Sequence, residues 1–167
     1  MSSAGRFSHV SSDGRARMVD VSRKRVTKRA ATAEAWVDVG PVIARRLRQS
    51  GAVAKGRVLE TARLAGLLGA KQTPYLIPMC HPLPLEAVEV EARVIGCRVR
   101  LVVTVRCAGQ TGVEMEALVG AAVAALTVYD MVKSAGRGVE IGPVRLLEKR
   151  GGKSGYWKRR EGPNGTG

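Results

Sequence analysis

Two ionisable side chains near the end of one predicted helix could form an acid–base pair. Asp130 and Lys133 are three residues apart in the stretch 112–134, where apolar side chains recur every three or four residues. Residues with that spacing share a helix face, so the two groups could exchange or share a proton. A solvent-exposed ion pair has the same spacing. The pair is therefore a candidate catalytic site, and a purely structural contact is its alternative.

A proline-rich loop carries a second candidate group. Cys80 and His81 lie between Pro78 and Pro82, which restrict the backbone around them. A thiol and an imidazole held on such a loop could act as a nucleophile and an acid–base group. A surface histidine beside a buried thiol is the alternative. Adjacent residues seldom chelate one metal ion, and the three cysteines form no CxxC pair, so no metal site is predicted.

The predicted helix also begins with acidic residues. Residues 111–114 (TGVE) have the pattern of a capping box with Thr111 as the N-cap, which accounts for Glu114. Glu116 complements the helix dipole, but capping does not explain it. Glu114 and Asp130 are sixteen residues apart in the sequence, which is about 24 Å along a helix. One compact pocket of one chain cannot contain both ends, so we expect either a site shared between subunits or two sites.

The stretch 149–155 (KRGGKSG) combines basic residues with glycines. Lys149 and Lys153, together with exposed glycine amides, could hold phosphate oxygens. The stretch is not a Walker A motif, because that motif requires a glycine where this sequence has Leu147 and a helix afterwards. A disordered basic tail is the alternative.

The net charge of +14 is concentrated at the two ends of the sequence. Residues 1–29 contribute +6 and residues 145–167 contribute +5, which leaves +3 for the residues between them. A nearly balanced centre with basic ends favours an anionic small substrate over a nucleic-acid duplex, so no nucleic-acid partner is predicted. Two rival hypotheses remain: a basic module that binds RNA or an acidic protein without catalysis, and a catalytically idle structural subunit.

The sequence predicts a cytoplasmic protein that does not span a membrane. An odd number of cysteines argues against a disulfide framework and fits a reducing compartment. Residues 1–30 are polar and basic and lack the apolar segment of a signal peptide. The longest apolar run, 117–129, is too short to cross a bilayer.

Hydrophobic periodicity predicts a protein with both strands and helices. Alternation of apolar and polar residues predicts strands, and apolar spacing of three to four predicts helices. The predicted strands are 29–39, 88–94, 98–106 and 139–147, and the predicted helices are 40–49, 57–70 and 112–134. Pro74, Pro78, Pro82 and Pro84 predict a loop over 72–85.

The order of these elements predicts the fold class. Strand, two helices, hairpin, helix and strand are typical of the split β-α-β arrangement with an extra helix in its first crossover. The predicted class is α+β, ferredoxin-like, with a four-stranded antiparallel sheet and helices on one face. Residues 18–155 are predicted as a single catalytic domain, residues 1–17 as a disordered segment, and residues 156–167 as a basic flexible tail.

Four segments taken together closely resemble one enzyme family. They are MVDVS (18–22), LIPMCHPLPL (76–85), GQTGVEMEALVGAAVAALTVYDMVKS (109–134) and IGPVRLLEKRGGKSG (141–155). From Met18 to about Gly155 the sequence resembles the cyclic pyranopterin monophosphate synthase family of molybdenum cofactor biosynthesis. The resemblance implies conversion of 3′,8-cyclo-7,8-dihydroguanosine 5′-triphosphate into cyclic pyranopterin monophosphate, with release of pyrophosphate.

The same resemblance implies an assembly and a set of site residues. It implies a ferredoxin-like subunit in a hexamer of three dimers with sites at the dimer interfaces, which would resolve the separation along the helix. Asp130 matches the catalytic position. The implied substrate-binding residues are Met79, Cys80, His81, Met115 and Glu116, and Lys55, Lys133 and Lys149 look like the pocket lysines. The sequence departs from the family at Arg57, commonly an acid, at Gln110, commonly a lysine, and at Val132, commonly a cysteine.

That substrate requires a ring rearrangement and attack of a sugar hydroxyl on the α-phosphate. Asp130 and Lys133 are suited to serve as base and acid for the first step, because a lysine crowded by other cations loses its proton more easily. Lys55, Lys149 and Lys153 could stabilise the departing pyrophosphate. No cofactor is predicted, although Mg²⁺ could accompany the triphosphate.

Overall fold

The computed structural model describes Arg15 and residues 18–160 of the chain. The predicted disordered segment 1–17 lies outside the described residues except for Arg15, and so do residues 161–167 of the predicted tail.

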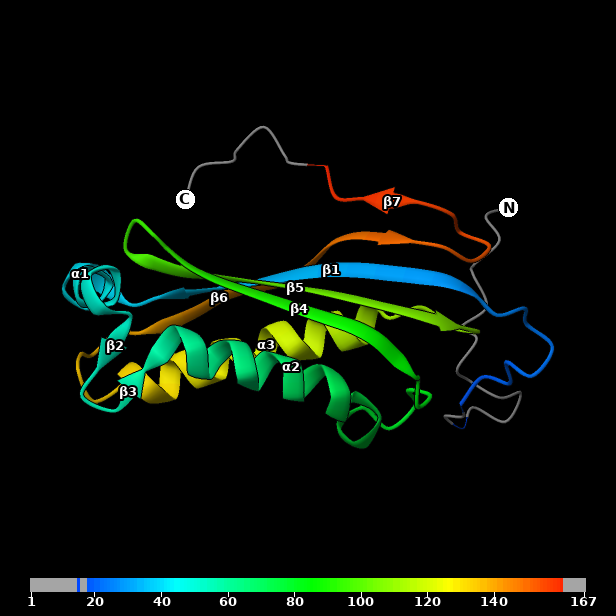
Figure 1. The fold of residues 1–167 in the computed structure, drawn as a ribbon, viewed down its shortest axis with the longest axis horizontal. Coiled ribbons are helices and arrows are strands. Elements are labelled where there is room, and N and C mark those ends of the chain that lie inside the picture. The colour runs from blue at the N-terminus through cyan, green and yellow to red at the C-terminus, as the bar shows by residue number, and fades with distance from the viewer. Residues whose placement is uncertain (1–14, 16–17, 161–167) are drawn as a thin grey trace.

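One antiparallel sheet forms the framework (Figure 1). Its strands in chain order are β1 (Thr27–Asp38), β4 (Leu85–Ile95), β5 (Arg98–Gly109), β6 (Glu140–Arg150) and β7 (Trp157–Lys158). The spatial order is β4-β5-β1-β6-β7 and every neighbouring pair is antiparallel. The prediction of four strands is therefore wrong by one. Gly151 and Gly155 adopt positive φ angles of 98° and 62°, and the chain reverses there so that β7 pairs with the end of β6. The stretch predicted as a tail thus begins with a paired strand.

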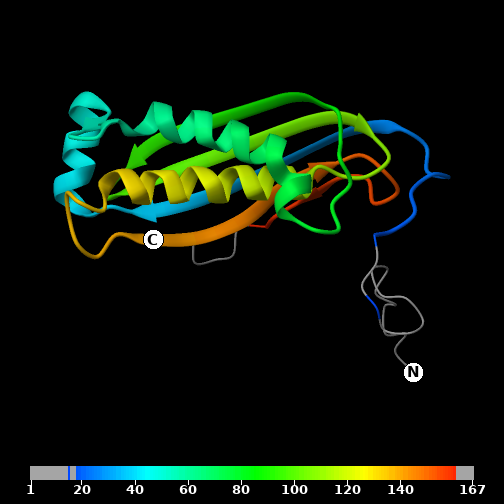
Figure 2. The ribbon, with the colours of Figure 1, turned by 90° about the horizontal axis from the view of Figure 1, so that it is seen from below.

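Two long helices cover one face of the sheet, as Figures 1 and 2 show. They are α2 (Val58–Leu76) and α3 (Glu114–Val132), while α1 (Gly40–Ser50) and the short hairpin of β2 (Ala52–Val53) and β3 (Gly56–Arg57) lie at one end of the sheet. The predicted alternation in β1 and β5 is confirmed, because one set of side chains is buried beneath the helices. These buried residues are Ala31, Ala33, Ala35, Val37, Val99, Leu101, Val103 and Val105.

The two long helices pack closely through glycine. A Cβ atom on Gly69 of α2 would lie 2.8 Å from the Cβ of Val123 on α3, and a Cβ atom on Gly120 would lie 2.9 Å from the backbone oxygen of Gly66. Only residues without a side chain permit this approach. Helix α3 has the length and composition of a membrane span, but it is mostly buried as the core helix of this fold.

Helix α2 continues past the point where proline predicted its end. The loop predicted over 72–85 is wrong for its first five residues, because α2 contains Pro74 and ends at Leu76. Thr73 is fully buried, and its hydroxyl donates to the Gly69 carbonyl at 3.3 Å. Packing of α2 against α3 offsets the stability that is lost because Pro74 cannot donate a backbone hydrogen bond. Ile77, the residue before Pro78, is extended and ends the helix.

The start of α3 also differs from its prediction. Val113, not Thr111, is the N-cap residue, and no side chain caps the helix. The capping box is wrong because the Glu114 carboxylate is used elsewhere: it accepts a hydrogen bond from Lys149 Nζ of β6 at 2.9 Å. An ion pair between helix and sheet replaces a local cap. The predicted helix 40–49 is confirmed as α1, with Pro41 in its first turn and Gly51, at φ of 67°, ending it.

We expect Gly69→Ala to destabilise the protein by a net of about 1–2 kcal/mol. Overpacking against Val123 costs about 1–3 kcal/mol, and the better helix propensity of alanine returns at most about 1 kcal/mol. Urea unfolding followed by circular dichroism measures this change. Gly142→Ala is the matched control, because its nearest neighbour would lie 3.5 Å away on Trp36. Equal stability of the Gly69 variant and the wild type would show that the helices can separate without loss.

Candidate active site

A pocket lined by both apolar and ionisable side chains lies at the start of α3. Its volume is about 250 Å³, and its walls come from the loop after α2, the turn before α3, the first turn of α3 and the N-terminal segment. The lining residues are Val19, Val21, Lys24, Met79, Cys80, His81, Leu83, Thr111, Gly112, Met115 and Glu116. Five residues predicted to bind substrate, from two segments distant in sequence, therefore meet in one cavity. They are Met79, Cys80, His81, Met115 and Glu116.

Glu116 is the most deeply buried ionisable group of this pocket, with 3% of its surface exposed. Burial raises the pKa of Glu116, and the negative charge of Glu114 acts in the same direction. A carboxyl group whose proton is retained to higher pH can donate a hydrogen bond or a proton to a ligand. Glu116 is thus a functional candidate on physical grounds that are independent of the sequence motif.

Cys80 is poorly suited to nucleophilic attack in this environment. Burial raises the pKa of its thiol, and the charge of Glu116 adds to the effect. The reactive form of cysteine is the thiolate, which a raised pKa disfavours. The geometry agrees better with Cys80 as a positioning residue than with the nucleophile that the Cys80–His81 pair suggested.

A second cluster lies at the opposite end of α3. The Lys133 Nζ atom is 2.6 Å from Asp130 Oδ1, and Lys55 Nζ is 3.6 Å from Asp130 Oδ2. Lys55 also donates to the backbone oxygen of Asp130 at 2.8 Å. Lys55 reaches this position because it lies in the tight turn that joins β2 to β3. Three of the predicted site residues are therefore in direct contact.

The charge states of this second cluster differ from the expectation for Lys133. The hydrogen bond from Lys133, followed by its charge, lowers the pKa of Asp130. The same hydrogen bond raises the pKa of Lys133, so the prediction that this lysine loses its proton easily is wrong for the single chain. The Asp130 carboxylate lies 2.6 Å from Lys133 Nζ, and its negative charge outweighs the effect of nearby cations on this lysine. In the single chain, Asp130 is accordingly held as the carboxylate and Lys133 as the ammonium.

Lys149 belongs to the first end of α3 and not to the second. Lys149 forms an ion pair with Glu114, which lies two residues before Glu116 in the sequence, and both partners of the pair are partly buried. Lys153 is exposed in the turn between β6 and β7. The predicted site residues thus fall into two groups, and Glu116 and Asp130 are fourteen residues apart on one helix, about 21 Å. A single chain does not bring the two groups together.

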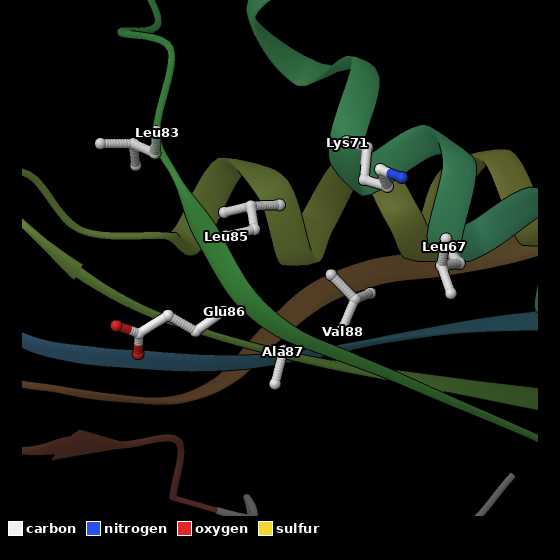
Figure 3. A pocket seen from close by; sticks show the side chains of 7 residues that line it. All are labelled: Leu67, Lys71, Leu83, Leu85, Glu86, Ala87 and Val88. Atoms are coloured by element: carbon white, nitrogen blue, oxygen red, sulfur yellow. The ribbon is translucent and has the colours of Figure 1, made fainter.

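A larger cavity of about 360 Å³ lies between the second half of α2 and the start of β4 (Figure 3). It is lined by Leu67, Lys71, Leu83, Leu85, Glu86, Ala87 and Val88. None of these residues was predicted to act in chemistry, and Figure 3 shows a lining of mainly aliphatic side chains. The groove therefore offers packing surface and not a catalytic arrangement.

Sequence reasoning missed several residues around the first pocket. Val19, Val21 and Lys24 line it from a segment without regular structure. Val19 and Val21 belong to the MVDVS segment and Lys24 follows it closely, which is the signal that could have identified them. Arg29 was also missed. Its guanidinium donates to the carbonyls of Gly109 and Gln110 at 3.3 and 3.2 Å. Among the residues that the structure describes, no group of three His, Cys, Asp or Glu side chains could hold a metal ion.

An α+β fold with ionisable and sulfur-containing side chains gathered in one pocket, and a second acid–base cluster on the same helix, defines an enzyme that acts on a small molecule. A family model described as the MoaC family matches residues 18–152. The chain belongs to this family, which is the cyclic pyranopterin monophosphate synthase family. Its members are enzymes of molybdenum cofactor biosynthesis.

We expect Glu116→Gln to make stability less dependent on pH. A raised pKa means that the folded state keeps the Glu116 proton longer than the unfolded chain does, so wild-type stability falls as pH rises from the ordinary carboxyl range through the folded pKa. Glutamine cannot ionise and escapes this loss. The variant should therefore gain stability relative to wild type between pH 4 and pH 7, which denaturant unfolding at both values measures. A relative loss over that interval would mean that the carboxylate is stabilised in the fold.

Proposed function

We propose that this protein is a cyclic pyranopterin monophosphate synthase that converts 3′,8-cyclo-7,8-dihydroguanosine 5′-triphosphate into cyclic pyranopterin monophosphate and pyrophosphate. Membership of the family carries the proposal. The gathering of Met79, His81 and Glu116 in one pocket supports it. Incubation of the purified protein with this substrate, followed by detection of pyrophosphate and of the pterin, tests it. RNA binding without any turnover would instead favour the rival hypothesis of a basic binding module.

In this proposal, two chains of a two-fold dimer share each active site. Three such dimers form a hexamer. The separation of the Glu116 pocket from the Asp130 cluster along one helix supports this arrangement. So does apolar surface on the outer side of the two helices, where Leu64, Leu68 and Leu126 are 69%, 55% and 59% exposed. Exposed apolar residues in such numbers are typical of surfaces that another chain covers.

The chemistry assigns complementary roles to the two clusters. The Asp130 carboxylate accepts a proton and Lys133 donates one while the rings rearrange, since their mutual contact leaves each in the required charge state. Lys55 from the same cluster, with Lys149 and Lys153 from the other chain, balances the charge that develops on the departing pyrophosphate. Any Mg²⁺ that takes part would arrive with the triphosphate. The protein would act in the cytoplasm without a resident cofactor.

We also propose that the fold is ferredoxin-like, as the order of elements predicted. The spatial order β4-β5-β1-β6 of the four long strands, with both long helices on one face, supports this. The strand β7 and the hairpin of β2 and β3 are additions to that framework.

We expect Asp130→Asn and Lys133→Ala to retain fold and assembly but to lose most turnover. Removal of a positioned acid or base typically costs about 10²- to 10⁴-fold in rate. Steady-state release of pyrophosphate measures the loss, and size-exclusion chromatography checks the assembly. Glu140→Gln, which neutralises an exposed acid at the start of β6, is the control and should retain wild-type rates. Near-normal rates in both site variants would refute the proton-transfer role.

Complementation between two inactive variants tests whether the site is shared. Glu116→Ala and Asp130→Asn proteins refolded together should form mixed dimers with one doubly damaged site and one intact site. Random equal mixing should restore about a quarter of wild-type activity, because about half of the dimers are mixed and each has one good site of two. If mixed dimers form, as shown by differential tagging, but remain inactive, the two groups do not act in sites shared in this way.

A further inference from the structure

We propose that residues 18–26 form a strap that closes the Glu116 pocket, and that the side-chain amide of Gln110 is the clamp that holds it. The strap is defined as the segment between Met18 and Val26, which precedes β1 and has no regular secondary structure apart from a turn. The role of the strap in substrate binding rests on the proposed function, whereas the clamp itself does not.

The strap contributes part of the wall of the pocket. Val19, Val21 and Lys24 line the same cavity as His81 and Glu116. Val19 and Val21 are partly buried, while the residues on either side of each are exposed. This alternation shows that one side of the strap faces the pocket. Removal of the strap would expose the pocket to solvent from that side.

The conformation of the strap is fixed at a turn. The backbone amide of Lys24 donates to the carbonyl of Val21 at 2.9 Å, and the amide of Ser22 donates to the Asp20 carboxylate at 2.9 Å. These contacts are local to the strap. They shape the turn but do not attach it to the rest of the protein.

Gln110 supplies the attachment. Its Nε2 atom donates to the carbonyl of Ser22 at 3.4 Å and to the carbonyl of Lys24 at 3.1 Å, on both sides of the residue at the centre of the turn. Arg29 in turn holds the backbone carbonyl of Gln110, so the clamp residue is itself oriented. The two acceptors are backbone carbonyls, and the clamp therefore requires a hydrogen-bond donor at position 110. A glutamate of the same shape offers no donor when it is ionised.

Position 110 is one of the three places where the sequence departs from the family that it resembles, which commonly has a lysine there. A lysine also carries only donors and could hold the same carbonyls. The glutamine in this chain therefore keeps the donor and removes the positive charge beside Thr111, at the edge of the pocket. Gln110 is a positioning residue in this account, because it acts on the substrate through the strap.

Amide hydrogen exchange of the full-length protein tests the clamp. The exchange of the Ser22 and Lys24 amides reports loosening of the turn, because Gln110 binds the carbonyls of the same two residues and so holds their local hydrogen bonds in place. Gln110→Glu and Gln110→Ala should raise their exchange rates about tenfold, and Gln110→Lys should keep them within about twofold of wild type. Gln49→Glu, the same chemical change at an exposed position in α1, is the matched control. Equal exchange in wild type and Gln110→Glu would overturn the clamp.

The kinetic constants test the wall. If the strap encloses the substrate, Gln110→Glu should raise KM several-fold and change kcat by less than about twofold, because the loss concerns binding and not the reacting groups. Faster exchange with an unchanged KM would overturn the role of the strap in substrate binding. Failure of the wild type to turn over the cyclic nucleotide would refute the proposed function, and the exchange experiment would still decide whether Gln110 is the clamp.

Discussion

The close approach of α2 and α3 is the constraint on which the arrangement of functional groups depends. Gly66, Gly69 and Gly120 bring the two helix backbones together over the sheet, where the core consists mainly of alanine and valine. Small side chains give a thin core, and a thin core requires helices that lie near each other and near the sheet. This packing holds α3 in one position along its length. Both clusters of ionisable residues are attached to α3, one at each end, so the same contacts fix both.

Two buried carboxylates show how the environment separates structural from chemical roles. Glu34 on the opposite face of the sheet is 1% exposed and accepts hydrogen bonds from Arg100 and Arg145 at 2.8 and 2.7 Å. Burial alone acts to raise the pKa of Glu34, but the hydrogen bonds from the two arginines outweigh it and lower the pKa. Glu34 is therefore a fixed anion that ties β5 and β6 to the central strand.

Glu116 is buried to a similar extent, but no arginine or lysine in the described part of the chain forms an ion pair with it, and its pKa is raised. A carboxyl group that retains its proton to higher pH can still donate that proton, or a hydrogen bond, to a ligand. Glu114, only two residues away, is already committed to Lys149. The sequence shows three similar glutamates, and only the partners that folding supplies distinguish their roles.

Periodicity in the sequence was sufficient to predict the sheet framework and its buried face. The alternation in β1 and in the hairpin of β4 and β5 survives because the buried positions beneath the helices carry small or branched apolar side chains. Local rules failed where a distant contact was stronger. Pro74 lies inside α2 because that helix packs along α3, and the capping box is absent because Glu114 binds a lysine on β6. Neither partner lies near the failing residue in sequence.

The predicted site residues fall at the two ends of α3 that helix length predicts, but their charge states were not predictable. Motifs identified His81, Glu116, Asp130 and the lysines, and helix geometry alone separated the two ends. Lys133 keeps its proton because its Nζ atom lies 2.6 Å from the Asp130 carboxylate. The composition of the sequence does not reveal this contact. The strap escaped prediction for a related reason. A segment without periodicity gives no indication of the surface on which it lies until the chain has folded.

The departures from the family pattern fall at places where the structure can accommodate them. Val132 is fully buried in the last turn of α3, where a cysteine would also behave as a small apolar residue. Arg57 stands beside the turn that carries Lys55 and is exposed, so it meets no steric limit. It adds a cation near a cluster in which Lys55 and Lys133 already face one carboxylate. The excess positive charge at this end of α3 is suited to a ligand with several negative charges, because a single aspartate cannot balance it.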